Sequence, residues 1–158
     1  MIKIVPLTPE LVLKSADDIR GADRREWLAG TGQTVEERLL SDTDWGFTRC
    51  VLDEEDNVLC FWGVQDTWVW MVATTLGQAR WRSLFRVLAP SLQEMQDLYP
   101  GQDLQCYADD RNVLHQLWLR SLGFDDRRTV FLGPHGLPFT LFVLKGEDTC
   151  VSKQQPQQ

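Results

Sequence analysis

Apolar residues recur along the chain at two spacings, which predict a mixture of strands and helices. A period of two predicts strands at residues 2–7, 45–52, 58–64 and 67–73. The last of these is apolar on both faces, as expected of a central strand. A period near 3.6 predicts a long helix over 76–98, which Pro90 is expected to kink because proline removes a backbone hydrogen bond.

Three shorter helices are predicted between the first two strands, at residues 8–19, 22–28 and 34–40. Thr8 and Pro9 supply an N-cap and a first-turn proline for the first. Gly30 is expected to end the second. The pair Thr34 and Glu37 forms a capping box that opens the third.

The second half of the chain predicts a strand at 104–108, a helix that follows it, and a closing hairpin of strands at 128–132 and 139–144. Asp109 and Asp110 are expected to cap the helix, and Gly123 to end it in a left-handed conformation. Its apolar stripe is expected to comprise Val113, Leu114, Leu117, Trp118 and Leu122. The order of these strands and helices predicts one α/β domain over residues 1–145, and the polar residues 146–158 are expected to form a disordered tail.

Composition narrows the class of protein. The chain has 158 residues and a net charge of −7, which disfavours broad nucleic-acid binding because phosphate contacts require a basic surface. No stretch approaches the roughly 20 apolar residues of a membrane span, and the N-terminus lacks a signal-peptide pattern. The sequence therefore predicts a cytosolic protein whose partners are proteins rather than nucleic acids. Its acidic, tryptophan-rich composition permits self-association.

The four cysteines have no metal-site spacing, so no metal is expected. Cys50 and Cys60 lie on neighbouring predicted strands, where a reducing cytosol favours two buried thiols over a disulfide. Cys150 falls in the tail and is expected to be a free thiol. Neither a Ser-His-Asp nor a Cys-His arrangement can be recognised in the sequence.

Tryptophan is unusually frequent, with seven residues in the chain. Five fall between positions 45 and 81, at Trp45, Trp62, Trp68, Trp70 and Trp81. Large aromatic side chains there could fill a core or line a groove, and the general preference for burial favours the core.

Two further groups are candidates for chemistry. Arg80, Arg82 and Arg86 could form an anion site, although a solvated basic face explains them as well. His115 has the side chain best suited to proton transfer near neutral pH, and a histidine buried beside Trp118 is the alternative.

The run from 105 to 124 resembles the last motif of the GNAT acyltransferase superfamily. The likeness rests on Asn112 opening a helix, followed by Gly123 and Phe124 eleven and twelve positions later. It implies a GNAT-like fold with a mixed, mostly antiparallel central sheet, and a cleft for acetyl-CoA. The residues that would bind the cofactor are Val72, Ala73, Thr74, Arg80, Arg82 and Asn112, and His115 would be the catalytic candidate.

The chain departs from the enzymes of that superfamily at three places. His115 and Leu119 replace a small residue and the tyrosine that protonates the leaving thiolate. The segment TTLGQARWRSLFR, residues 74–86, has one glycine where the enzymes have a glycine-rich phosphate loop. A leucine cannot donate a proton, and a loop with a single glycine gives the backbone little freedom to approach phosphates.

A narrower resemblance covers roughly residues 45–145. The run ADDRNVLHQLWLRSLGF (108–124) and the hairpin GPHGLPF (133–139) are similar to GNAT-like internal virion proteins of short-tailed, T7-like bacteriophages. This resemblance implies a place in the host cytoplasm or the virion, and a phage or host protein as partner. Two hypotheses follow: a virion-assembly protein with a degenerate acetyl-CoA site, or an active N-acetyltransferase for a small amine or a host protein.

Overall fold

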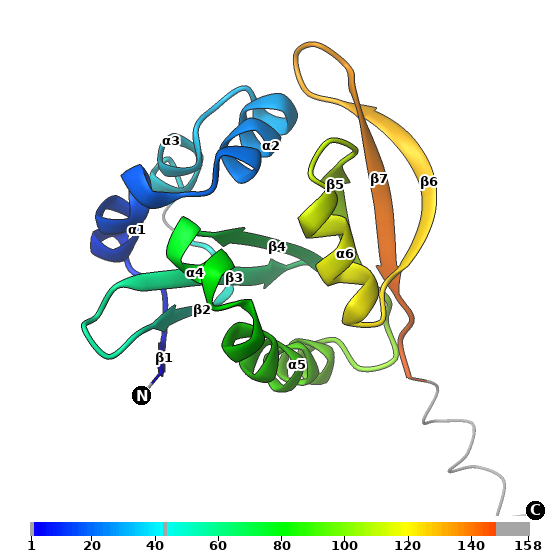
Figure 1. The fold of residues 1–158 in the computed structure, drawn as a ribbon. Helices are drawn as coiled ribbons and strands as arrows, with labels where there is room; N and C mark the ends of the chain where they lie inside the picture. The colour runs from blue at the N-terminus through cyan, green and yellow to red at the C-terminus, as the bar shows by residue number, and fades with distance from the viewer. Residues whose placement is uncertain (1, 43, 148–158) are drawn as a thin grey trace, which may run out of the picture.

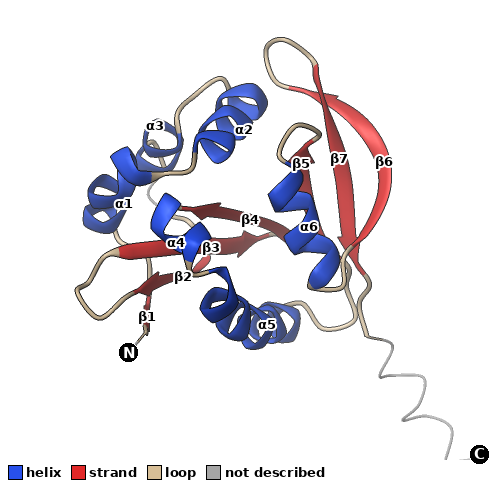
Figure 2. Cartoon of the chain, in the orientation of Figure 1, coloured by secondary structure: helices blue, strands red, loops and turns tan. Residues whose placement is uncertain are grey.

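The computed structural model describes residues 2–42 and 44–147, and this part of the chain forms one sheet with helices on both faces (Figure 1, Figure 2). The strands are β1 (Lys3–Val5), β2 (Phe47–Leu52), β3 (Val58–Gln65), β4 (Trp68–Ala73), β5 (Leu104–Asp109), β6 (Asp125–Leu132) and β7 (Leu137–Leu144). The helices are α1 (Pro9–Ser15), the short 3-10 helix η1 (Ala16–Asp18), α2 (Gly21–Thr31), α3 (Val35–Leu40), α4 (Thr75–Ala79), α5 (Trp81–Leu98) and α6 (Val113–Ser121). The predicted α/β class and element order are confirmed.

Two apolar cores lie on opposite faces of the sheet. Helices α1 to α3 cover one face, where the buried side chains include Val12, Val35, Leu39, Phe61 and Val72. Helices α5 and α6 cover the other, where the buried side chains include Trp62, Leu84, Leu88, Met95, Trp118 and Leu119. Both faces of β3 and β4 are therefore shielded, which explains why these strands are apolar at nearly every position.

The sheet has the strand order β1-β2-β3-β4-β5-β7-β6. All neighbouring strands are antiparallel except β4 and β5, which run parallel and share a single register pair, Trp68 with Gln105. The amide of Gln105 donates to the carbonyl of Thr67 at 2.9 Å, and no further pair joins the two strands. We call the region beyond this pair, towards Ala73 and Asp109, the strand splay.

Two predicted helix boundaries were wrong. Helix α2 continues through Gly30, whose lack of a side chain admits the Phe139 ring, and ends at Gly32, whose φ of 77° is left-handed. The predicted long helix consists of α4 and α5, which meet at Arg80, and α5 runs on through Pro90. The break at Arg80 lets α4 pack closely on β3, while the apolar side of α5 covers the opposite core.

The predicted cap and stripe of α6 also need correction. Asp109 ends β5 and Asn112 caps the helix by accepting from the His115 amide at 3.4 Å. Burial disfavours the charged form of Asp109, but hydrogen bonds from Arg111 hold its pKa below the ordinary value. Gly123 has the expected left-handed conformation, with φ 102°.

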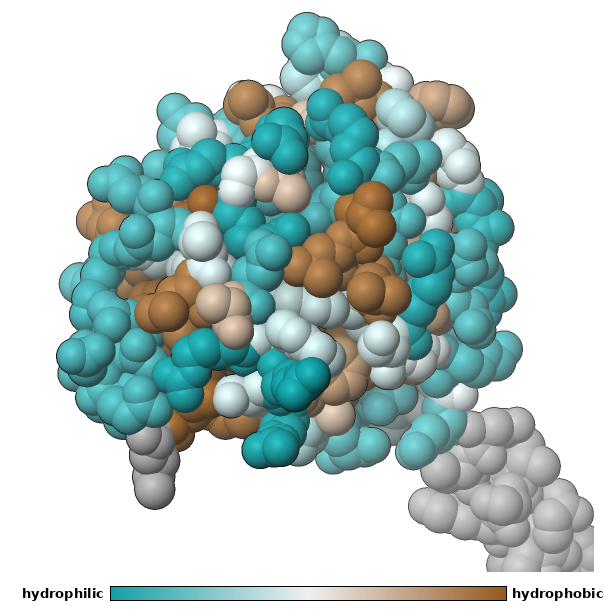
Figure 3. Space-filling view, in the orientation of Figure 1, coloured by the Kyte–Doolittle hydropathy of each residue, from teal (hydrophilic) through white to brown (hydrophobic). Residues whose placement is uncertain are grey.

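The predicted stripe of α6 is right in part. Trp118 is buried, and Leu114 and Leu122 pack against the core, as predicted. The inward face is nevertheless rotated, because His115 and Leu119 are also buried while Val113 and Leu117 are 70% and 54% exposed. Figure 3 shows apolar side chains on the surface over α6. The sequence pattern missed this rotation because the inward face includes a histidine, which the apolar period does not count.

Cys50 and Cys60 are buried free thiols, as predicted. They lie in different cores, because Cys50 pairs in register with Phe61 and Cys60 with Val51.

Cys150 and residues 148–158 of the predicted tail lie outside the described residues. Within the described residues, the structure has no helix that is both long and apolar enough to span a membrane.

We expect Gly77→Ala to destabilise the protein by roughly 2 kcal/mol or more. A Cβ at Gly77 would lie 1.9 Å from the backbone oxygen of Leu59, so α4 would have to move off β3. Gly21→Ala is the matched control, because the nearest atom to its new Cβ, on Arg25, is 3.6 Å away. Urea unfolding should give Gly21→Ala a stability within about 1 kcal/mol of the parent. Equal losses in the two variants would contradict this account of Gly77.

Candidate functional site

Two carboxylates from helix α2 occupy the strand splay. A backbone amide of a buried strand needs an acceptor, and the parting of β4 and β5 removes the usual one. Asp23 accepts from the Ala73 amide of β4 at 2.8 Å, and Glu26 accepts from the Asp109 amide of β5 at 2.7 Å. Because Asp23 and Glu26 are three residues apart, they share one face of α2 and reach both strands.

Asp23 is the centre of a buried polar network. Its carboxylate forms an ion pair with Arg20 at 2.6 Å and accepts from the Asn112 side chain at 2.9 Å. Arg20 also donates to Gln78 of α4 at 2.8 Å. Both charged side chains are more than 90% buried, so removing either partner would leave the other charge without compensation. The network joins α2, β4, α4 and the N-terminus of α6.

Glu26 joins the splay to a second cluster. The same oxygen that accepts from Asp109 lies 2.9 Å from Nδ1 of His115, and Nε2 of that histidine lies 3.9 Å from Sγ of Cys106. Burial by itself would lower the pKa of His115, but the Glu26 carboxylate and the contact with Cys106 raise it well above its ordinary value. All three side chains are buried.

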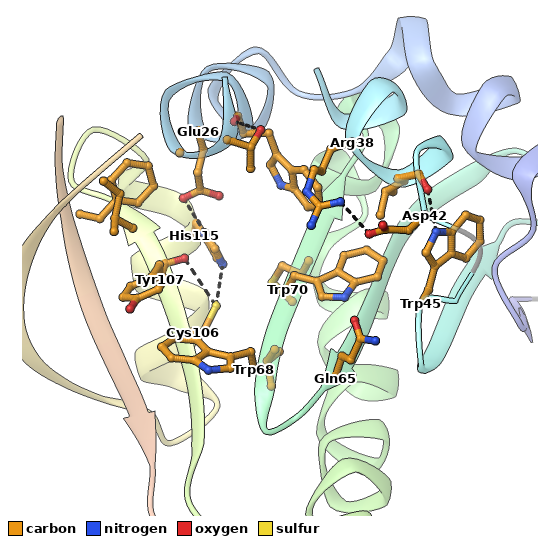
Figure 4. A pocket seen from close by; sticks show the side chains of 18 residues that line it. Glu26, Arg38, Asp42, Trp45, Gln65, Trp68, Trp70, Cys106, Tyr107 and His115 are labelled. Atoms are coloured by element: carbon orange, nitrogen blue, oxygen red, sulfur yellow. Dashed lines mark hydrogen bonds and ion pairs between the residues drawn. The ribbon is translucent and has the colours of Figure 1, made fainter. Parts of the chain in front are cut away.

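A cavity of about 390 Å³ opens beside this cluster (Figure 4). Its aromatic lining comprises Trp27, Trp45, Trp68, Trp70, Tyr107 and Phe139, and we call it the aromatic cavity. Trp68 stacks on Tyr107 with ring centroids 4.6 Å apart, and Trp70 meets Trp27 edge-on at 5.8 Å. Glu26, Cys106 and His115 lie at one side, and the exposed ion pair of Arg38 with Asp42 lies at the other.

The tryptophans therefore divide between core and cavity. Trp62 is buried and donates to Ser91 at 2.6 Å, as expected for a core residue. Trp45, Trp68 and Trp70 line the cavity instead, and Trp81 is 47% exposed. The strand pattern could not separate these roles. Whether a tryptophan on a strand face is buried or lines a cavity depends on which helices cover that face, and the pattern does not show this.

The predicted cofactor residues on β4 are engaged by the protein itself. Val72 is buried in the core beneath α1 to α3. The backbone of Ala73 donates to Asp23 and accepts from the Arg20 amide at 3.0 Å. Thr74 caps α4 by accepting from the Gly77 amide and pairs with Ile19 in an isolated bridge. Residues 19 and 20 thus lie along the edge of β4 that faces the splay.

The remaining predicted residues do not meet at one place. Asn112 reaches the splay and contacts Asp23. Arg80 forms an ion pair with Glu54 at 3.2 Å, in the turn between β2 and β3. The guanidinium of Arg82 lies 5.5 Å from the ring of Trp81. The arginines and Asn112 therefore do not form a common anion site.

The residues at the splay do not fit acetyl-CoA. A pantetheine arm needs free backbone groups along the edge of β4, and Asp23 and Arg20 use those of Ala73. The diphosphate needs exposed amides at a glycine-rich turn, and the single glycine there, Gly77, packs against Leu59.

Sequence reasoning missed Asp23, Glu26 and Cys106. The sequence shows no recognisable Cys-His arrangement, and the structure brings Cys106 against His115. Glu26 and His115 are 89 positions apart, so no local spacing links them. Two acids at i and i+3 inside a helix without a strong apolar stripe were the only signal. Within residues 2–42 and 44–147, no group of three or more His, Cys, Asp or Glu side chains is placed to hold a metal.

No protein-family model matches the sequence, and no curated protein matches it. Solved structures do match. The ribosomal-protein-S5-alanine acetyltransferase from Vibrio fischeri is 13% identical, with a TM-score of 0.65 over 93% of this chain and 94% of that one. A mutant of the spermidine N-acetyltransferase from Vibrio cholerae is 8% identical, with a TM-score of 0.63 over 91% and 93%.

An N-acetyltransferase from Staphylococcus aureus is 11% identical, with a TM-score of 0.61 over 92% of this chain and 97% of that one. Likeness at such low identity concerns the fold and not the reaction. The chain therefore has the fold of the GNAT N-acetyltransferases, as the sequence motif predicted.

We expect Asp23→Ala to lower the free energy of unfolding by about 3–5 kcal/mol, because it leaves Arg20 and the Ala73 amide buried without their partner. Asp42→Ala is the control, because its ion pair with Arg38 is exposed and should cost at most about 1 kcal/mol. Urea unfolding of both variants measures the difference. A loss for Asp23→Ala no larger than that for Asp42→Ala would show that the network adds little.

Proposed function

We propose that this protein is a binding protein built on the GNAT fold, which holds a cationic group of a basic protein partner in the aromatic cavity and does not use acetyl-CoA. The observation that carries the proposal is the occupied splay, where Asp23 and Glu26 hold the strand amides that a cofactor would need. Cofactor-dependent transfer would first require this buried network to be dismantled.

The chemistry of the aromatic cavity supports a cationic ligand. Aromatic faces attract ammonium and guanidinium groups, and the attraction strengthens where water is excluded. Glu26 and Asp42 place carboxylates at the cavity, where each also contacts a basic side chain, His115 and Arg38 respectively. The net charge of −7 would also attract a basic partner over longer distances. A lysine or arginine side chain, or a free amine, meets all three conditions.

The sequence resemblance supplies a setting for this activity. The runs at 108–124 and 133–139 resemble internal virion proteins of short-tailed phages. In that setting the basic partner is a phage or host protein, and the site of action is the host cytoplasm or the virion. A role in virion assembly is the corresponding proposal.

An acetyl-CoA-dependent N-acetyltransferase is the second candidate. Two observations favour it: the solved structures described above are N-acetyltransferases by name, and the aromatic cavity opens beside the splay. An amine in this cavity would be the acceptor. Both candidates share a cationic ligand, so the cofactor distinguishes them.

Calorimetric titration with acetyl-CoA tests the choice. We expect no binding at micromolar concentrations, because the splay is filled by residues 19–26. Micromolar binding that is lost in Arg80→Ala combined with Arg82→Ala would overturn the proposal in favour of the acetyltransferase. Binding that survives this double substitution would equally contradict a filled splay, and would place the cofactor away from the two arginines.

A lysine tetrapeptide amide is a suitable probe of the cavity, and tryptophan fluorescence measures its binding. We expect Trp70→Leu to weaken its binding roughly tenfold, because one aromatic face of the cavity is removed. Trp81→Leu is the matched control, since Trp81 is exposed and does not line the cavity. Equal affinity of the two variants, or greater loss in Trp81→Leu, would contradict the assignment of the site.

A further inference from the structure

Three side chains with complementary acid-base chemistry meet at the wall of the aromatic cavity. Cys106 comes from β5, His115 from α6 and Glu26 from α2. The carboxylate of Glu26 lies 2.9 Å from Nδ1 of the imidazole, and the thiol sulfur lies 3.9 Å from Nε2 (Figure 4). The carboxylate, imidazole and thiol lie in that order, which is the arrangement of an orienting acid, a base and a nucleophile.

The two ring nitrogens of His115 have different partners. The Glu26 carboxylate faces Nδ1, and Nε2 faces the sulfur of Cys106, whose thiol also donates to the Tyr107 carbonyl at 3.6 Å. A second contact fixes Glu26, because the Asp109 amide donates to the same carboxylate oxygen. The fold therefore holds the imidazole between a carboxylate and a thiol, and the raised pKa of His115 favours the imidazolium, which stabilises a thiolate beside it.

Cys50 and Cys60 provide an internal comparison. Burial raises the pKa of the Cys50 thiol to about 12, and it raises that of Cys60 well above the ordinary value. Within the described residues, neither thiol hydrogen-bonds to a histidine, and neither lines the aromatic cavity. Of the three cysteines within the described residues, only Cys106 combines a base with a cavity wall.

We propose that Cys106, His115 and Glu26 form a nucleophilic thiol site that takes an acyl group from a small aryl ester held in the aromatic cavity. The volume of about 390 Å³ suits a single small molecule. The stacked pair of Trp68 and Tyr107 borders the cavity beside Cys106 and offers an aromatic face to an aryl group. This activity goes beyond the proposed binding function and does not depend on it.

The reaction has two balanced steps. In the first, Nε2 of His115 takes the thiol proton, the Cys106 sulfur bonds to the ester carbonyl carbon, and the C–O bond breaks. The departing aryl alcohol takes the proton from Nε2. In the second step, water attacks the thioester carbon and the S–C bond breaks. The acid departs and the thiol regains a proton through His115. The sum is hydrolysis of one ester by one water.

Several charged groups surround the histidine and bear on its response to pH. Glu26 faces it from α2, and Cys106 faces it from β5. The ion pair of Arg20 with Asp23 lies one turn earlier on α2 and contacts Asn112, which caps the helix of His115. At the end of β5, Asp109 is paired with Arg111. These two ion pairs are internally balanced, so Glu26 is the dominant charge on the imidazole.

The test uses p-nitrophenyl acetate on the full chain carrying Cys150→Ser, which removes the tail thiol. Intact-mass and peptide mass spectrometry then follow acetylation of each cysteine, while absorbance follows the released phenol. We expect acetyl to appear on Cys106 first and to be absent from Cys50 and Cys60. Cys106→Ser should abolish the phenol burst. Acetylation spread evenly over the three cysteines, or no acetylation of Cys106, would overturn the proposal.

His115→Gln keeps a hydrogen-bonding side chain of similar size and should lower the acetylation rate of Cys106 roughly 100-fold. An unchanged rate in the folded variant would overturn the role of the base. If the variant does not fold, the pH dependence of the Cys106 acetylation rate in the parent protein tests the same role. The acetylation rate of a free cysteine is half-maximal at a pH of about 8.5, and we expect the midpoint for Cys106 at least one pH unit lower. A midpoint at or above the free-cysteine value would contradict the proposal.

Glu26 acts through His115 and is a positioning residue. We expect Glu26→Gln to move the midpoint of the rate profile upward, because the imidazolium that stabilises a thiolate loses its carboxylate partner. A purely structural role would change the amplitude and leave the midpoint in place, which would contradict this assignment. Glu94→Gln is the control and should leave the profile unchanged, because Glu94 is exposed, pairs with Arg49 and does not line the cavity.

Discussion

The fold depends on how the buried backbone amides of two parallel strands find acceptors where the strands separate. Strands β4 and β5 share one register pair and then separate, leaving buried backbone amides without strand partners. Asp23 and Glu26 of α2 accept from these amides at 2.8 and 2.7 Å. Burying two carboxylates is costly, and each is compensated: Asp23 by Arg20 and Asn112, Glu26 by His115.

This arrangement ties the cavity to the splay. The residues of α2 that face β4 and β5 are followed on the same helix by Trp27 and Gly30, which line the aromatic cavity. A shift of α2 would open the splay and reshape the cavity together. In this chain Asp23 and Glu26 fill the splay with a buried polar network. The GNAT-like fold thus carries two carboxylates of α2 between the strands that separate.

Much of the architecture could be predicted from local signals. The capping box of Thr34 and Glu37, the left-handed Gly123 and the closing hairpin all appear where expected, because each depends on residues a few positions apart. The errors have a common cause. Gly30 was taken for a helix end and Asp109 for a cap, yet contacts with Phe139 and with Arg111 gave these residues other roles.

The sequence by itself determined the order of strands and helices, their turns and the GNAT-like motif, because backbone propensity and hydrophobic period act over short distances. Only the tertiary structure decided which carboxylates meet the unpaired strand amides and which cysteine meets a base. Glu26 meets Asp109 and His115 across 83 and 89 positions, whereas Cys106 and His115 are nine positions apart on two different elements, β5 and α6. The formation of these contacts depends on how α2 and α6 pack around the splay, which no spacing along the chain records.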